Sequence, residues 1–229
     1  MTALGAPGRS FSAFLFDMDG TLLDSTAFVE RIWGKWAIRH GFDPESFIRT
    51  IHGVRAIDVI TPLGLENIDP RKEALNMEAQ ELEDLDGVVP IAGAIDFLNS
   101  LHREKWAIVT SAPIELARRR MAAAGIPMPD VIISGEDVIL GKPNPACYLL
   151  GAEKLGVDPL DCLVFEDAPA GIIAGELAGS CVVVVTAAHR HEQSTRHFAV
   201  GSYRGLRTRS LANGLMQIMD LAEDSRSTR

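Results

Sequence analysis

The sequence predicts an α/β fold in which a doubly wound parallel sheet carries a small all-helical domain inserted after its first strand. Short apolar runs alternate with helix-like segments along most of the chain, as in sheets whose parallel strands are joined by crossover helices. One long stretch, from residue 26 to about 85, breaks this alternation because it contains no strand-like run.

The apolar runs are typical of strands that are buried on both faces of a sheet. Each run is continuous rather than alternating and is rich in β-branched or aromatic residues. The runs cover residues 13–16, 106–110, 162–165 and 181–185, with a weaker one at 131–133. Between them we expect helices at 92–103, 113–124, 145–156 and 169–178.

The stretch without strands is predicted to form a helical cap. Trp33 and Trp36 stand three residues apart on its first helix, and we expect both to pack inside the cap. We predict a cap domain at residues 25–86 and a core domain made of residues 1–24 and 87–229, joined by two segments on which the cap can hinge. The cap helices are expected at 27–40, 44–52, 55–64 and 70–85.

The composition excludes several classes of protein. The chain has 229 residues, a net charge of −9 and an isoelectric point near 5.1, which argues against nucleic acid as a partner. Its three cysteines lack CxxC or metal-site spacing, and no stretch resembles a signal peptide or a membrane span. We therefore expect a cytoplasmic protein with no membrane partner. The sequence does not determine the oligomeric state, and a monomer is favoured.

Carboxylates follow two of the predicted strands. Asp17 and Asp19 come after the first strand, and Glu166 and Asp167 follow the run at 162–165. Ligand sites in open α/β sheets form where strands end, so these groups can converge. Two carboxylates about 4 Å apart repel each other by on the order of 4 kcal/mol at an effective dielectric of 20, so such a group needs a cation. Carboxylate oxygens favour Mg²⁺.

These carboxylates have two alternative interpretations. Glu166 and Asp167 could form an ordinary solvated turn. A calcium loop at DMDG is excluded, because neither alignment of this stretch supplies the glycine and the ligands that the loop requires.

Two further segments indicate binding of an anion. Ser111 follows the predicted strand 106–110 and precedes a helix start, where free backbone N–H groups and the hydroxyl can hold a phosphate. The alternative for Ser111 is a simple helix cap. Lys142 lies in the short loop GKPNP, where the following proline favours an extended backbone. The alternative for Lys142 is a solvated surface lysine.

Four stretches in order resemble the motifs of the haloacid dehalogenase superfamily. They are FLFDMDGTLLDS (14–25), IVTSA around Ser111, GKPNPACYLLGAEKLG from Lys142, and VFEDAPAGIIAG around Asp167. The chain is similar to the phosphatase branch with a helical cap after the first strand. WAIRHG, IHGVRAI and PIAGAI resemble bacterial sugar and polyol phosphatases of the hexitol phosphatase and glycerol-3-phosphatase type.

The resemblance implies a role for each matching residue. Asp17 would attack phosphorus, and Asp19 would protonate the leaving alcohol and then activate water. Mg²⁺ would be held by Asp17, the backbone carbonyl of Asp19 and Asp167, with Glu166 behind them. The phosphoryl group would be bound by Thr110, Ser111 and Lys142, and the substrate would be contacted in the cap by Arg55 and His52.

These roles predict a Mg²⁺-dependent phosphatase acting on small sugar or polyol phosphates. One alternative is a phosphosugar mutase of the β-phosphoglucomutase type, but relatives of that type carry a histidine about where Val29 stands. The other is a non-catalytic phosphosugar-binding protein, although all the motif side chains are present. Outside the motifs, we expect the arginines at 118–120 to form a solvated helix face and His189, His191 and His197 to be solvated.

Overall fold

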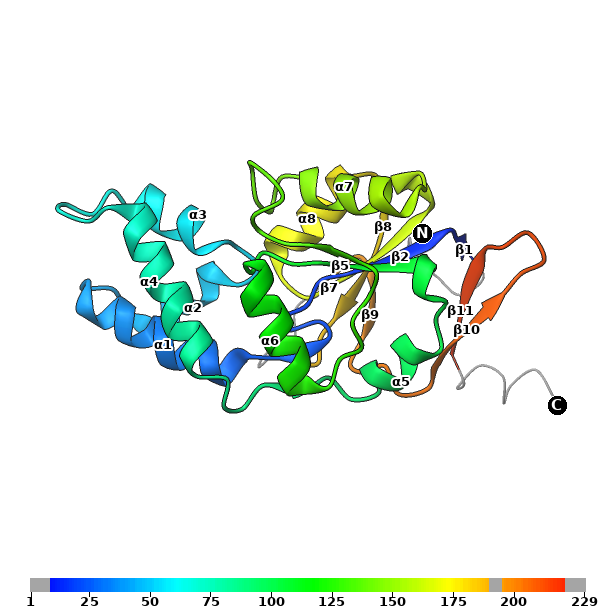
Figure 1. The fold of residues 1–229 in the computed structure, drawn as a ribbon, viewed down its shortest axis with the longest axis horizontal. Helices are drawn as coiled ribbons and strands as arrows, with labels where there is room; N and C mark the ends of the chain where they lie inside the picture. The colour runs from blue at the N-terminus through cyan, green and yellow to red at the C-terminus, as the bar shows by residue number, and fades with distance from the viewer. Residues whose placement is uncertain (1–8, 190–194, 221–229) are drawn as a thin grey trace.

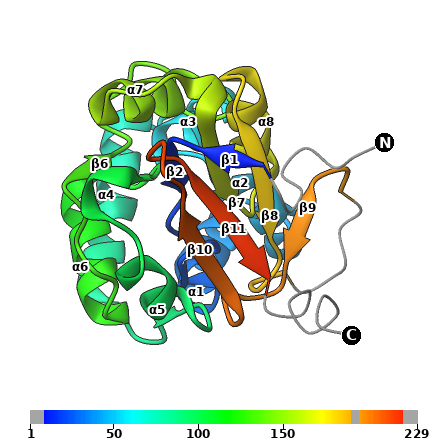
Figure 2. The same ribbon diagram turned by 90° about the vertical axis from the view of Figure 1, so that its right-hand side faces the viewer.

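The computed structural model describes residues 9–189 and 195–220. Its centre is a six-stranded parallel sheet in the order β6-β5-β2-β7-β8-β9 (Figures 1 and 2). Five strands match the predicted runs to within one residue, which confirms the parallel α/β sheet, whereas β9 was not predicted. The strands are β2 (Ala13–Phe16), β5 (Trp106–Val109), β6 (Val131–Ile133), β7 (Cys162–Glu166), β8 (Cys181–Val185) and β9 (Phe198–Val200).

Helices cover both faces of this sheet, so alternate residues of each central strand enter different hydrophobic clusters. Phe14 and Phe16 of β2 pack with side chains of α5 and α6, and Ala13 and Leu15 pack with side chains of α7 and α8. The four helices are α5 (Ala94–Asn99), α6 (Ile114–Ala124), α7 (Ala146–Leu155) and α8 (Pro169–Leu177), and two short 3-10 turns are η2 (Arg103–Lys105) and η3 (Pro159–Asp161).

A second, three-stranded antiparallel sheet lies beside the first and was not predicted (Figure 2). It contains β1 (Ser10–Phe11), β10 (Leu206–Ser210) and β11 (Met216–Asp220) in the order β1-β11-β10. Leu206 and Met216 join the hydrophobic cluster that contains Phe14, so this sheet closes one side of the core.

The predicted cap is present as four helices with a hydrophobic cluster of their own (Figure 1). Trp33 and Trp36 are buried in that cluster, as the sequence predicts, and Phe47 packs against both rings. The helices are α1 (Thr26–Arg39), α2 (Pro44–Ile51), α3 (Ala56–Ile60) and α4 (Pro70–Glu83), and a 3-10 turn, η1 (Thr61–Leu63), follows α3.

The two connections between cap and core lie side by side. β3 (Leu23–Asp24) pairs with β4 (Val89–Pro90) in an antiparallel ribbon, so the chain enters and leaves the cap at one place. The division at residues 25 and 86 remains a prediction, which the separate cap cluster supports. Across the described ranges, every helix is too short or too polar to cross a bilayer.

Candidate active site

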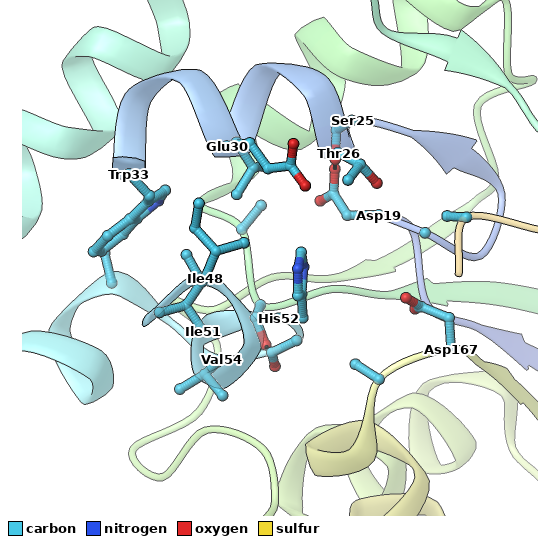
Figure 3. A pocket seen from close by; sticks show the side chains of 18 of the residues that line it. Asp19, Ser25, Thr26, Glu30, Trp33, Ile48, Ile51, His52, Val54 and Asp167 are labelled. Atoms are coloured by element: carbon cyan, nitrogen blue, oxygen red, sulfur yellow. Dashed lines mark hydrogen bonds between the residues drawn. The ribbon is translucent and has the colours of Figure 1, made fainter. Parts of the chain in front are cut away.

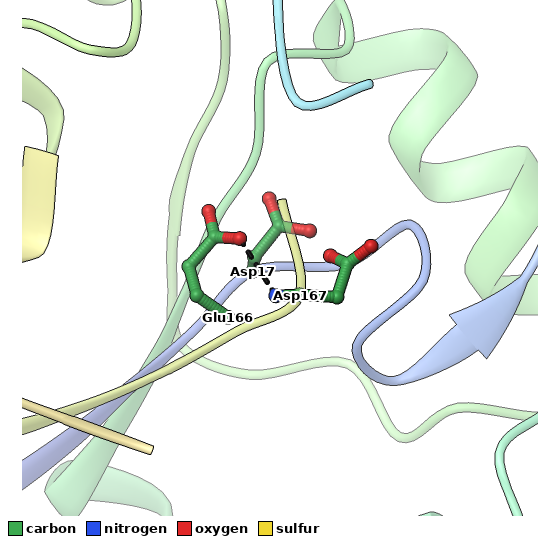
Figure 4. Close-up of side chains that lie close together, drawn as sticks. All are labelled: Asp17, Glu166 and Asp167. Carbon is green, nitrogen blue, oxygen red and sulfur yellow. Dashed lines mark hydrogen bonds between the residues drawn. The ribbon is translucent and has the colours of Figure 1, made fainter. Parts of the chain in front are cut away.

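Three carboxylates meet where β2 and β7 end (Figure 4). Phe16 of β2 stands in register with Phe165 of β7, and the Asp17 backbone N–H donates to the Phe165 carbonyl over 2.9 Å. The next residues of the two strands are therefore neighbours. Carboxylate oxygens of Asp17, Glu166 and Asp167 lie within 4.8 Å of one another, and all three side chains are buried.

Lys142 is the cation beside this cluster, not a surface lysine. Its Nζ lies 2.5 Å from Asp17 Oδ1 and 2.7 Å from Glu166 Oε1, and it donates to the Val109 carbonyl over 3.1 Å. Burial alone would lower the pKa of Lys142, but the two adjacent carboxylates outweigh burial and raise it. The ammonium group therefore stays charged and uses all three of its N–H groups.

Glu166 accepts hydrogen bonds from four donors. Besides Lys142, these are the Tyr148 hydroxyl at 2.9 Å and the backbone N–H groups of Asp167 and Ala168 at 2.8 and 3.0 Å. A Cβ atom at Gly171 would lie 1.5 Å from Glu166 Oε1, so only glycine allows this arrangement. The carboxylate of Glu166 is thus occupied in orienting Lys142 and the loop after β7.

Asp17 and Asp167 hold charge that is not fully compensated. Burial and the neighbouring carboxylates raise the pKa of Asp17 to about 8 despite Lys142, and the same causes raise the pKa of Asp167. Thr21 donates to Asp167 over 3.1 Å, and a Cβ at Gly20 would lie 2.1 Å from Asp167 Oδ2. Two buried oxygen ligands whose charge needs compensation fit a divalent cation such as Mg²⁺.

Asp19 faces a cavity between cap and core rather than the carboxylate cluster (Figure 3). Its Oδ1 accepts a hydrogen bond from the Ser25 hydroxyl over 2.6 Å, and its Oδ2 lies 2.9 Å from Arg120 Nη1. The carboxyl group is one quarter exposed, at 26%. It can therefore meet a bound molecule while two partners fix its orientation.

The cavity has a volume of about 670 Å³ and joins the cap to the sheet edge. His52 points into it from the cap, opposite Asp19 and Asp167 (Figure 3). Thr110 and Ser111 line it from the end of β5, and the Ser111 hydroxyl donates to the backbone carbonyl of Gly53 in the cap over 2.8 Å. Two of the three predicted phosphate-binding residues, Thr110 and Ser111, therefore line the cavity, whereas Lys142 lies buried behind it against Asp17.

Arg55 is not one of the described residues that line this cavity. Its guanidinium donates to the backbone carbonyls of Gly135, Val138 and Ile139 and forms an ion pair with Asp58. These contacts fasten the cap to the loop after β6. Arg55, which the sequence predicts to contact the substrate, is thus occupied in holding the cap to the core.

Sequence reasoning missed Arg120 and misjudged His189. The arginines at 118–120 were expected to be solvated, yet Arg120 is 4% exposed and bonds to Asp19 and to Glu81. His189 was also expected to be solvated, but it is half-buried, lines the cavity and lies 2.9 Å from the Asp167 carbonyl oxygen. His197, also expected to be solvated, has 8% of its side chain exposed, and its Nε2 lies 2.6 Å from Glu176 Oε1. His191 lies outside the described residues.

Comparisons with known proteins identify a family and relatives of this chain. A model of the haloacid dehalogenase-like hydrolases matches residues 11–179. Hexitol phosphatase A of Escherichia coli is 44% identical over 178 residues, which cover 76% of this chain and 82% of that protein. Glycerol-1-phosphate phosphohydrolase 1 of Saccharomyces cerevisiae is 35% identical over 75% of this chain and 73% of its own.

A solved structure shares the fold. The family IA, variant 3 hydrolase from Entamoeba histolytica superposes with a TM-score of 0.71 and 25% identity, covering 84% of this chain and 94% of that one. The matched region contains the carboxylate cluster, Ser111 and Lys142 in the order that the sequence analysis describes. On the family match and the 44% identical relative, the chain belongs to the haloacid dehalogenase-like hydrolases.

Proposed function

We propose that this protein is a Mg²⁺-dependent phosphatase that hydrolyses monophosphates of small sugars and polyols through an aspartyl-phosphate. One observation carries the proposal: Asp17 lies buried beside Lys142 and Asp167, at the floor of a cavity that Asp19 also lines. The relatives named as hexitol and glycerol-1-phosphate phosphatases support the choice of substrate class.

Two displacements account for the reaction. A carboxylate oxygen of Asp17 attacks phosphorus, and the bond to the substrate oxygen breaks as Asp19 gives that oxygen its proton. Asp19 then takes a proton from water, which attacks the aspartyl-phosphate, releases phosphate and restores Asp17. Asp17 and Asp19 both line the cavity, and Asp17 is the more deeply buried of the two. One carboxylate can therefore attack while the other transfers protons.

The remaining residues neutralise charge on the phosphoryl group. Mg²⁺ would be held by Asp17, Asp167 and the Asp19 carbonyl, and when bound it compensates the negative charge that collects during transfer. Thr110 lies where its hydroxyl can donate to a phosphoryl oxygen, and Ser111 can do so once its hydroxyl leaves the Gly53 carbonyl. Lys142 already serves three acceptors, so a phosphoryl oxygen has to replace one of them.

The cap end of the cavity suits a neutral, hydroxylated group. Glu30 and Glu78 line it together with the apolar surfaces of Trp33 and Ile48, and the cation of Arg49, which also lines it, is paired with Glu45. Burial, followed by the nearby Glu81, raises the pKa of Glu78, so this carboxyl gains from a hydroxyl donor and disfavours a second anion. A polyol chain matches these lining groups better than a second phosphate does.

A panel of phosphorylated metabolites tests the proposed function. With Mg²⁺ present, we expect release of phosphate from sorbitol 6-phosphate and glycerol 1-phosphate at least about tenfold faster than from fructose 1,6-bisphosphate, since about 1.4 kcal/mol of repulsion suffices for that ratio. Phosphate release is read by a colorimetric assay. Conversion of glucose 1-phosphate into an isomer without net release would favour the mutase alternative, and binding without turnover would favour the binding protein.

Magnesium is expected to raise the midpoint of thermal unfolding more at pH 8.5 than at pH 6. The pKa of Asp17 is raised to about 8, and that of Asp167 is also raised, so at pH 6 the cation has to displace protons. Each displaced proton weakens the apparent affinity by about tenfold per pH unit below the carboxyl pKa. Differential scanning calorimetry at fixed Mg²⁺, with EDTA and KCl controls, measures the effect, and equal shifts at both pH values would contradict it.

In the metal-free protein, the raised pKa of Asp17 makes the free energy of unfolding decrease as the pH rises. The folded-state pKa of Asp17 lies above the unfolded value near 3.8, so its contribution to stability is full below that value and is lost as the pH rises toward 8. The EDTA-treated protein therefore serves as the reference at each pH.

A further inference from the structure

Arg120 joins a cap helix to Asp19 through its two terminal nitrogens. Nη1 lies 2.9 Å from Asp19 Oδ2 in the core, and Nη2 lies 2.9 Å from Glu81 Oε2 on α4 of the cap. The other oxygen of Glu81 accepts a hydrogen bond from Trp33 Nε1 on α1 over 2.9 Å. The Arg120 guanidinium group thus links the loop after β2 to α4, and Glu81 links it further to α1.

The guanidinium group has little freedom. Arg120 is 4% exposed and Glu81 is 8% exposed, and the Phe28 ring of the cap lies 5.2 Å from the guanidinium carbon. A planar fork that is fixed on two edges and one face determines the direction of each N–H group. Ser25 holds one oxygen of the Asp19 carboxyl group, and the position of the other oxygen depends, through Arg120, on where α4 holds Glu81.

Stability alone does not explain this arrangement. A buried ion pair costs desolvation of both groups, and apolar side chains of similar volume are often at least as stabilising. Burial raises the pKa of Glu81 even though Arg120 opposes that shift, so desolvation outweighs the pair. The charges of Arg120 and Glu81 therefore indicate a role in the active-site cavity, which both residues line.

We propose that Arg120 is a positioning residue that aligns the Asp19 carboxyl group for proton transfer only while α4 is docked on the core. If the cap swings away, Glu81 and Trp33 leave with it, and Arg120 loses the partners that fix its second edge. Closure over a substrate thus completes the proton-transfer group as well as excluding water. This inference rests on the proposed function, because it assigns to Asp19 the proton that the leaving group requires.

Two substrates with different leaving groups test the proposal. Sorbitol 6-phosphate releases an alkoxide, which needs the proton from Asp19, whereas acetyl phosphate releases acetate, which does not. Since a positioned general acid contributes about 10²–10⁴-fold, we expect Arg120→Met to lower kcat/KM for sorbitol 6-phosphate by at least about 100-fold and for acetyl phosphate by less than about threefold. For sorbitol 6-phosphate, kcat should fall while KM changes little.

Matched variants separate positioning from folding. Arg120→Lys should recover part of the kcat/KM for sorbitol 6-phosphate that Arg120→Met loses, because an ammonium group can reach one carboxylate but not bridge both. Glu81→Gln should show the same substrate-selective loss, smaller in size: an amide that keeps its oxygen toward Trp33 turns its NH2 group toward Arg120, so the bond to Arg120 is lost while Arg120 still bonds to Asp19. Arg119→Met is the control, because Arg119 is exposed on the same helix and pairs only with Glu115 among the described residues.

The outcomes are distinct. Equal losses for the two substrates in Arg120→Met and Glu81→Gln would overturn the positioning role and leave a structural one. Should Arg120→Met fail to fold, the Arg120→Met/Glu81→Met double variant removes both buried charges and is assayed in its place. Absence of phosphate release by the wild-type protein from either substrate would reject the proposed function itself, whereas an active wild type with unselective variants rejects this inference alone.

Discussion

Asp17→Asn is expected to abolish phosphate release while leaving the protein folded. An amide is a poor nucleophile toward phosphorus, so kcat for sorbitol 6-phosphate should fall on the order of 10⁴-fold or more. Burial and nearby carboxylates raise the pKa of Asp17 to about 8, so a neutral side chain relieves a cost at pH 8.5 and the midpoint of thermal unfolding without Mg²⁺ should not fall. Phosphate release and calorimetry on the same preparation measure both effects.

Asp96→Asn is the control for this substitution. Asp96 lies exposed on α5, away from the cavity, so the same chemical change there should leave turnover unaltered. If Asp17→Asn kept turnover within tenfold of the wild type, a direct attack by Asp17 would be ruled out. A loss of turnover together with a large drop in the unfolding midpoint would instead show that Asp17 holds the fold.

The sheet and the residues at its edge could be predicted because their signals are local. The central strands are continuous apolar runs, and a parallel sheet brings their carboxyl ends to one edge, so Asp17 and Asp167 could be expected to converge. β10 and β11 could not be predicted in the same way. In β10 only Leu206 is apolar and the four residues after it are polar, so the strand lacks the repeated apolar positions that identify a half-buried hairpin.

The positions of Arg55 and Arg120 could not be predicted from local sequence signals. Both lie on or beside helices, and the sequence analysis placed the first at the substrate and the second in solvent. In the structure Arg55 is held by carbonyls some 80 residues further along the chain, and Arg120 by a carboxylate of the cap. Which arginine faces the cavity depends on how α4 and the loop after β6 dock, and no periodicity within one helix carries that information.

Lys142→Met is expected to cost both turnover and stability. The lysine lies against Asp17 and Glu166 with about 1% of its side chain exposed, so its loss leaves buried carboxylates without their cation. Removing one partner of a buried ion pair lowers the free energy of unfolding by about 3–5 kcal/mol. Turnover should fall at least about 100-fold, since one preorganised charge at a transferring group is worth that much. Urea unfolding and phosphate release provide the two measurements.

The pH dependence of this destabilisation distinguishes lost charge from lost packing. Lys142 lowers the pKa of Asp17, so the variant has a still higher Asp17 pKa and binds a proton there at pH 5. A protonated carboxyl needs no cation, and the loss of stability relative to the wild type should therefore be smaller at pH 5 than at pH 8.5. Lys154→Met, at an exposed lysine on α7, should change neither stability nor turnover. A deficit of equal size at both pH values would show that Lys142 acts through packing, and the charge balance inferred for this cluster would be wrong.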